Sequence, residues 1–163
     1  MTPASLEAAR ATLEAARAKG LKIVTAESCT GGLVSAALTD VAGSSDVMDR
    51  GFITYSNESK TGLLLVNSHV LITHGAVSAP VAQAMAVGAL SRSRADVAVA
   101  VTGIAGPGGG SEAKPIGLVH FACARRGHPT RLVERRFGDL GRDKVREAAA
   151  AQALALLHDA CVA

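Results

Sequence analysis

The sequence predicts an α/β fold, a three-layer α/β/α sandwich around a mixed sheet of about five strands. Short apolar runs typical of buried strands alternate with longer segments whose apolar residues recur at helical spacing. Two strand-like segments, 116–125 and 130–137, are separated by only a few turn-forming residues, which is typical of a hairpin. One antiparallel pair among alternating strands and helices predicts a mixed sheet between helical layers.

Hydrophobic periodicity and turn residues place each element in order. Pro3 suits the first turn of an initial helix, and Gly20 suits its end. Ala95 to Val101 is an unbroken run of Ala and Val with one charge, Asp96, and is expected to be a central strand buried on both faces. The expected helices are 3–19, 30–41, 57–65, 69–74, 78–92 and 143–158, and the expected strands are 21–26, 50–56, 95–101, 116–125 and 130–137.

Length and composition exclude several classes of protein. A chain of 163 residues fits one domain, 1–163, which can bury about 70% of the surface that the unfolded chain exposes. Aromatic residues make up 2% and the net charge is +3, which argues against a nucleic-acid partner. Three cysteines without CxxC spacing argue against a disulfide framework or a metal site and favour the cytoplasm. Neither a signal peptide nor a membrane anchor is recognisable, so no membrane partner is expected.

Three polar clusters follow predicted strands. They are residues 27–32 after the first strand, 55–60 after the second, and 102–111 after the strand at 95–101. If these strands are neighbours, the clusters meet at one edge of the sheet. In open α/β sheets this edge is where ligands bind, because helix N-termini converge there.

The residue types in these clusters are typical of nucleophilic catalysis. A serine such as Ser28 needs a base, and Lys60 can act as one where burial lowers its pKa. Tyr55 could relay a proton, and backbone N–H groups of the turn 30–32 could stabilise an oxyanion. The structural alternatives are that Ser28 and Thr30 cap a helix and that Lys60 is a solvated helix residue.

The glycine-rich loop 102–111 could bind an anion. Consecutive glycine N–H groups form anion nests, and Arg142 and Arg146 lie four apart on one face of the last predicted helix. The spacing of the glycines in this loop excludes a P-loop. No G-x-G-x-x-G follows the first predicted strand, which excludes the dinucleotide-binding motif as well. A poorly ordered surface loop is the structural alternative.

Four motifs together resemble a known family. They are TAESCTGG at 25–32, GFITYSNESK at 51–60, HGAVS at 74–78 and VTGIAGPGGG at 101–110. With the Gly138-Asp139 and Arg142 region, they resemble the CinA C-terminal domain, or PncC, family. The resemblance covers nearly the whole chain from Leu21 through the Gly138-Asp139 and Arg142 region, without motif-level support in the first helix and the final turns. It implies a three-layer α/β/α fold with a five-stranded mixed sheet.

The resemblance also implies a function. Members of this kind hydrolyse nicotinamide mononucleotide (NMN) to nicotinic acid mononucleotide and ammonia in pyridine nucleotide recycling. We therefore expect NMN as the partner molecule, no cofactor, and a homo-oligomer in the cytoplasm. The alternative is a non-catalytic module that binds a nucleotide or a protein in DNA uptake or the damage response.

Carried over by position, the resemblance implies a hydroxyl nucleophile, Lys60 as its base and Tyr55 as a hydrogen-bonding or proton-relay partner. Ser28 is the first choice of nucleophile, and Ser45, in a Gly-Ser-Ser loop, is its rival. The joint presence of these four residues favours the enzyme over the binding module. The residues expected to bind the substrate are Glu27, Thr30, Gly31, Gly32, Thr102, Gly103, Gly106, Gly108, Gly109, Gly110 and Arg142.

Overall fold

A computed structural model describes residues 1–163 and confirms the predicted fold class. The strands are β1 (Ile23–Glu27), β2 (Met48–Ile53), β3 (Val97–Gly103), β4 (Leu118–Arg125) and β5 (Arg131–Arg136). They form one sheet in the order β2-β1-β3-β4-β5. Strand β1 runs parallel to both β2 and β3, whereas β3 with β4 and β4 with β5 are antiparallel, so the sheet is mixed.

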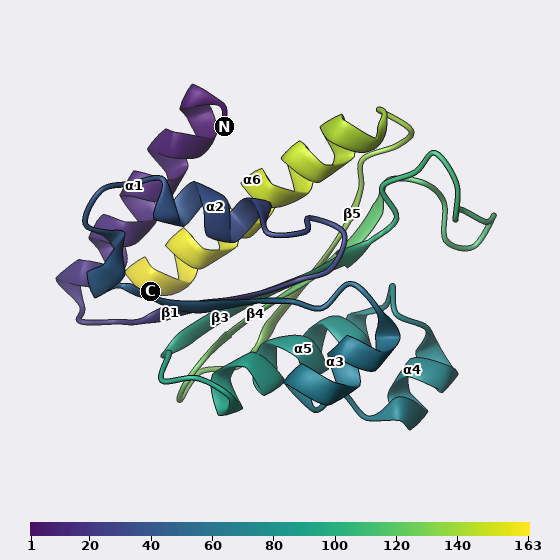
Figure 1. Cartoon of the computed structure of the whole chain (residues 1–163), viewed down its shortest axis with the longest axis horizontal. Helices are drawn as coiled ribbons and strands as arrows, with labels where there is room; N and C mark the ends of the chain where they lie inside the picture. Colours follow the sequence, from purple (N-terminus) through teal and green to yellow (C-terminus); the bar gives the residue numbers. More distant parts are fainter.

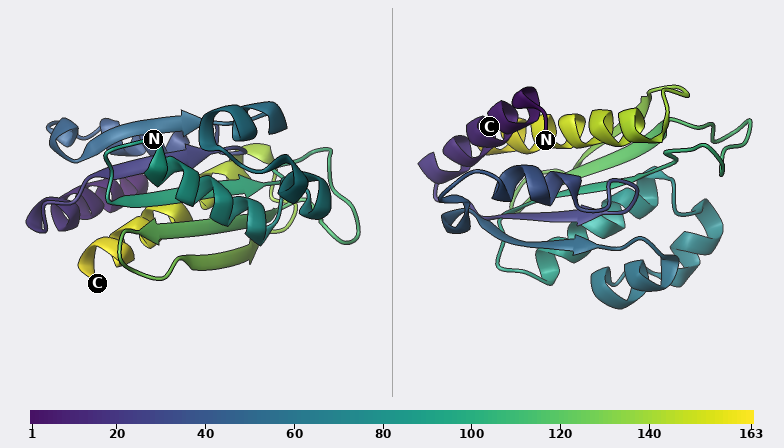
Figure 2. Two further views of the ribbon diagram at one scale, coloured as in Figure 1. Left: turned by 90° about the horizontal axis from the view of Figure 1, so that it is seen from below. Right: turned by 45° about the horizontal axis from the view of Figure 1, so that its top comes forward.

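Helices cover both faces of this sheet (Figure 1). One layer holds α1 (Pro3–Ala18), α2 (Leu33–Thr39) and α6 (Arg142–Val162), and the other holds α3 (Asn57–Leu64), α4 (Ser68–His74) and α5 (Ala79–Ser91). A 3-10 helix, η1 (Ser44–Asp46), precedes β2. The turned views in Figure 2 show both chain termini in the layer of α1 and α6. None of the helices combines the length and the apolar character that crossing a membrane requires.

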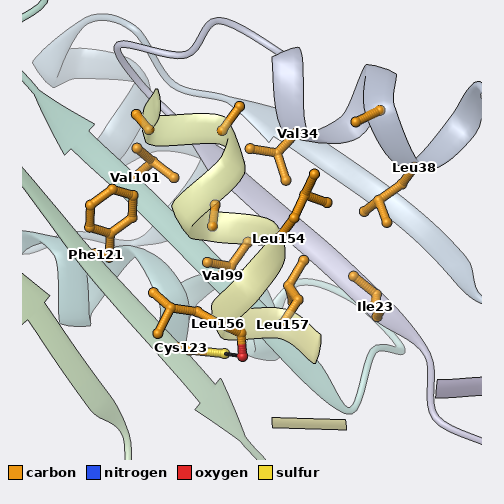
Figure 3. Packing of buried hydrophobic residues seen from close by; sticks show 14 of the residues in the cluster. Ile23, Val34, Leu38, Val99, Val101, Phe121, Cys123, Leu154, Leu156 and Leu157 are labelled. Atoms are coloured by element: carbon orange, nitrogen blue, oxygen red, sulfur yellow. Dashed lines mark hydrogen bonds between the residues drawn. The ribbon is translucent and has the colours of Figure 1, made fainter. Parts of the chain in front are cut away.

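Side chains of β1 alternate between the two layers, as the pleat of a strand requires. Ile23 packs in the larger apolar cluster, on the side of α1, α2 and α6, whereas Val24 and Ala26 pack in the second cluster, under α5. Figure 3 shows α6 laid over the sheet in the larger cluster, where the Cys123 thiol donates a hydrogen bond to the Leu156 carbonyl at 3.6 Å. This alternation later decides which polar residues reach the site.

Most elements begin or end a few residues from the expected positions, and three of these differences stand out. Helix α2 begins at Leu33 instead of residue 30, because Gly31 and Gly32 have φ values of 58° and 107°, which a right-handed helix cannot include. Strand β2 ends at Ile53, so Tyr55 lies in the segment before α3. Helix α6 extends beyond the expected end to Val162. The first two shifts leave irregular backbone beside the sheet edge where the polar clusters lie.

Candidate active site

Ser28 and Lys60 are in direct contact. The Lys60 Nζ lies 2.9 Å from the Ser28 Oγ, 2.8 Å from the carbonyl oxygen of Thr54 and 3.3 Å from that of Tyr55. Ser28 follows the last residue of β1, and Lys60 lies in the first turns of α3, which continues from β2. Because β1 and β2 are parallel neighbours, both side chains lie at the carboxyl edge of the sheet.

Local sequence and hydrogen bonds position both Lys60 and Ser28. The Ser56 hydroxyl accepts a hydrogen bond from the Ser59 N–H and so starts α3 just before Lys60. Helical side chains point back toward the N-terminus of their helix, which takes the Lys60 amine toward the carbonyl groups of Thr54 and Tyr55. The Ser28 N–H donates to the Val101 carbonyl at 2.9 Å and holds the backbone of Ser28 against β3.

Burial favours the neutral form of the Lys60 amine. The residue is 1% exposed, no carboxylate pairs with it, and burial lowers its pKa from the usual lysine value. Its neighbour Cys29 supplies no negative charge at neutral pH, because burial raises the pKa of that thiol to about 11. A neutral amine can donate its two N–H groups to the Thr54 and Tyr55 carbonyls and accept the Ser28 hydroxyl proton on its lone pair.

Arg142 joins the second polar cluster to the glycine loop. At the start of α6, its guanidinium donates to the Gly106 carbonyl at 2.7 Å and to the Tyr55 hydroxyl at 2.9 Å. Tyr55 is 61% exposed, so its hydroxyl and the guanidinium lie at the rim of the site. Only the backbone carbonyl of Tyr55 contacts Lys60 directly.

A cavity of about 270 Å³ connects these groups. It reaches from the buried Ser28 and Lys60 to the exposed Tyr55 and Arg142, and no carboxylate lines it. The expected substrate-binding residues that line it are Thr102, Gly103, Gly106, Gly108, Gly109 and Arg142. Gly110 lines the neighbouring hollow on the other side of the loop. The carboxyl edge of the sheet therefore brings together all three polar clusters.

Several lining residues were not expected from the sequence. Asn57 and Cys29 contribute polar groups, and one apolar wall comes from Ala76 and Val77 and another from Ile104 and Ala105. The Thr102 hydroxyl donates to the Ala76 carbonyl at 2.9 Å and so ties the first wall to β3. The HGAVS motif at 74–78 was the available signal for that wall.

Glu27 does not reach the cavity, contrary to expectation. Its carboxylate accepts hydrogen bonds from the Val34 N–H at 2.9 Å, the Ser35 N–H at 3.0 Å and the Ser35 hydroxyl at 2.9 Å. Gly32, the N-cap residue of α2, has no side chain to cap that helix, and the fully buried Glu27 caps it instead. Because neighbouring strand residues face opposite sides, Glu27 points toward α2 while Ser28 points toward α3.

The carbonyl side of the turn 30–32 packs against α6. Arg146 donates to the Cys29 and Thr30 carbonyls, both at 3.1 Å, and a Cβ on Gly31 would lie 3.1 Å from its guanidinium. The absence of a side chain at this position leaves room for Arg146, and none of the three turn residues lines the cavity. Thr30 is fully buried and its hydroxyl has no partner.

The structure does not bring Ser45 to Lys60. Ser45 lies in η1, before the first residue of β2, whereas Lys60 follows the other end of that strand. The six residues of β2 separate the two ends by roughly 20 Å. Ser45 is exposed and lines a different hollow with Ser35 and Asp49. Only Ser28, of the two candidate nucleophiles, has the amine within reach.

Comparisons with known proteins agree with this architecture. Nicotinamide-nucleotide amidohydrolase PncC of Escherichia coli K12 is 52% identical over 145 residues, which are 88% of this chain and 87% of that protein. A putative competence-damage inducible protein of Symbiobacterium thermophilum is 53% identical over 147 residues, 86% of this chain but 34% of the longer relative. The crystal structure of competence/damage inducible protein CihA from Agrobacterium tumefaciens superposes with a TM-score of 0.96 at 51% identity, covering 99% of this chain and 97% of that one.

The family model of the CinA C-terminal domain matches residues 6–161. This match includes all five strands, all but the ends of α1 and α6, and all the cavity residues described above. The chain therefore belongs to the CinA C-terminal domain family.

Proposed function

We propose that this protein hydrolyses NMN to nicotinic acid mononucleotide and ammonia, with Ser28 as nucleophile and Lys60 as general base. The observation that carries the proposal is the 2.9 Å contact between the Lys60 Nζ and the Ser28 Oγ in a buried, carboxylate-free site. A relative 52% identical over most of the chain is named as a nicotinamide-nucleotide amidohydrolase, which supports this substrate. The proposed setting is the recycling of pyridine nucleotides in the cytoplasm.

Acylation follows from the contacts of Lys60. The neutral amine takes the proton of the Ser28 hydroxyl while the Oγ bonds to the carboxamide carbon of NMN, giving a tetrahedral intermediate. The resulting Lys60 ammonium then gives that proton to the amide nitrogen. The carbon–nitrogen bond breaks, ammonia leaves, and the nicotinoyl group stays on Ser28 as an ester.

Deacylation uses the same pair in reverse. Water attacks the ester carbonyl, and Lys60 accepts one of its protons. When the ester bond breaks, Lys60 returns this proton to the Ser28 Oγ, and nicotinic acid mononucleotide is released. The two carbonyl oxygens of Thr54 and Tyr55 hold the amine at the same place throughout both steps.

The remaining cavity residues suit the rest of the substrate. The pyridinium ring fits between the apolar walls of residues 76–77 and 104–105, beyond the reach of any carboxylate. The phosphate belongs at the exposed rim, where Arg142 supplies positive charge and the glycine loop supplies N–H groups. Arg142 already contacts Tyr55 and Gly106, so it is positioned before the substrate arrives.

A direct test is to incubate the purified protein with NMN and measure ammonia and nicotinic acid mononucleotide. We expect release by the wild type, loss of release in Ser28→Ala, and wild-type release in Ser45→Ala. Hydroxylamine should intercept the acyl ester on Ser28 and yield the corresponding hydroxamate. Absence of release from the wild type would favour a non-catalytic binding module. Loss of activity in Ser45→Ala together with full activity in Ser28→Ala would overturn the assignment of the nucleophile.

A further inference from the structure

The turn that follows Ser28 is held from the α6 side by a single guanidinium. Arg146 donates from Nε to the Cys29 carbonyl and from a terminal nitrogen to the Thr30 carbonyl, both at 3.1 Å. The Ser28 carbonyl accepts from the Gly31 N–H at 3.0 Å, which closes the turn. All three carbonyl groups of this turn therefore have donors within the protein.

The N–H groups of the same turn are in the opposite situation. Those of Cys29 and Thr30 donate to no acceptor in the protein, although the two residues are 6% and 0% exposed. Buried backbone N–H groups without an acceptor are rare in folded proteins, since each costs free energy comparable to a lost hydrogen bond. Two of them directly after a nucleophile candidate indicate a place for an oxygen atom of a ligand.

Peptide geometry links these N–H groups to Arg146. The peptide between Cys29 and Thr30 is trans, so its C=O and N–H point in opposite directions. Arg146 binds the C=O from the layer of α6, and this leaves the Thr30 N–H directed away from that layer. The opposite layer contains α3, from which Lys60 reaches Ser28.

We propose that Arg146 is a positioning residue that orients the Thr30 N–H, beside that of Cys29, toward the oxyanion formed when Ser28 attacks a carboxamide. The inference rests on the proposed amidase function. Arg146 touches neither substrate nor reacting atoms; it holds two peptide planes in place before the charge develops. Such preorganised donors stabilise a transition state more than the ground state, because they need no reorganisation as the negative charge forms.

The test compares Arg146→Gln and Arg146→Lys with a matched control, Arg125→Gln. Arg125 also donates to two backbone carbonyls, those of Ala160 and Ala163, but at the far end of α6. Steady-state kinetics with NMN should show kcat reduced about tenfold to a hundredfold in Arg146→Gln with KM within about twofold. Arg146→Lys should recover only part of the loss, because an ammonium lacks the fork that spans two carbonyls. Arg125→Gln should keep the wild-type kcat.

An NMN analogue with an aldehyde in place of the carboxamide adds a second readout. Addition of Ser28 to this aldehyde creates the oxyanion without a leaving group, so its affinity should fall in Arg146→Gln by the same factor as kcat. A kcat within twofold of wild type in both Arg146 variants, or an equal loss in Arg125→Gln, would overturn the proposal. If Arg146→Gln does not fold, Arg146→Lys with the aldehyde decides the question. A wild type that releases no ammonia would instead refute the amidase function itself.

Discussion

Two serine side chains lie at opposite ends of the parallel strands β1 and β2, Ser28 after the carboxyl end of β1 and Ser45 before the amino end of β2, and their surroundings differ. At the carboxyl end, Ser28 is 8% exposed and contacts a buried lysine amine. At the amino end, Ser45 is exposed, and the nearby lysine, Lys22, is an exposed residue whose amine donates to the Asp46 carbonyl. Burial of the amine therefore distinguishes the candidate site from a polar loop of similar composition.

The same contrast holds between adjacent residues. Glu27 and Ser28 are neighbours in the sequence, yet one caps α2 with three hydrogen bonds and the other lines the cavity. Both are buried, so exposure does not separate their tasks. The two residues have different roles because their side chains lie on opposite faces of the sheet.

Lysine-to-methionine substitutions at Lys60, near the carboxyl ends of β1 and β2, and at Lys22, before the amino end of β1, should have the most unequal effects. Lys60→Met removes the proposed base, so kcat for NMN should fall about a hundredfold to ten-thousandfold. The fold should survive, because an apolar side chain of similar size replaces a buried amine. Lys22→Met should leave kcat unchanged. Ammonia release by both variants, with thermal unfolding as a check, measures the contrast; equal effects would contradict it.

The pH dependence should report the Lys60 amine. Burial lowers its pKa below the ordinary lysine value, and only the unprotonated amine is a base. The kcat/KM for NMN should therefore rise with pH through this lowered pKa and fall about tenfold for each pH unit below it. Activity measured across pH should show this acid limb. A limb at the ordinary lysine pKa would mean that burial does not perturb the amine.

The lowered pKa of Lys60 also makes the free energy of unfolding depend on pH. Between the lowered pKa of the folded state and the ordinary pKa of the unfolded chain, the unfolded state binds more protons. The contribution of Lys60 to the free energy of unfolding should thus increase with pH in this window. Denaturant titrations of the wild type and Lys60→Met should differ in this slope; identical slopes would contradict it.

Glu27→Leu tests the other face of β1. The Val34 and Ser35 N–H groups would lose their acceptor, and we expect the free energy of unfolding to fall by about 3 kcal/mol. Glu27→Gln keeps one acceptor oxygen and should lose less. Urea denaturation measures both values. A Glu27→Leu variant with wild-type stability that loses NMN binding would show that Glu27 contacts the substrate after all.

Tyr55→Phe should have the smallest effect. It removes one hydrogen bond at the exposed rim, to Arg142, and should lower kcat/KM for NMN by about tenfold at most. Michaelis–Menten kinetics measure this change. A loss as large as that of Lys60→Met would instead make the phenol a proton relay between the rim and the Ser28–Lys60 pair.

Local pattern predicted the elements well but not the fine boundaries near the site. The Ala/Val run of 95–101 correctly indicated a buried central strand, since only a strand covered on both faces tolerates such a composition. The start of α2 was wrong because Gly31 and Gly32 are left-handed, a conformation that glycine permits but does not require. The tasks of Glu27 and Arg146 depend on α2 and α6, and neighbouring sequence contains no information about those contacts.

The sequence by itself determined the α/β class, the mixed sheet and the three polar clusters after strands, because periodicity and turn residues act locally. It also supplied both serines as candidates, without a ground for choosing between them other than the strand-end turn. The tertiary structure decided which serine meets a buried amine and which polar residues turn away. The physical reason is that strand order and side-chain alternation set the distance between groups far apart in the chain, and burial sets the pKa of Lys60.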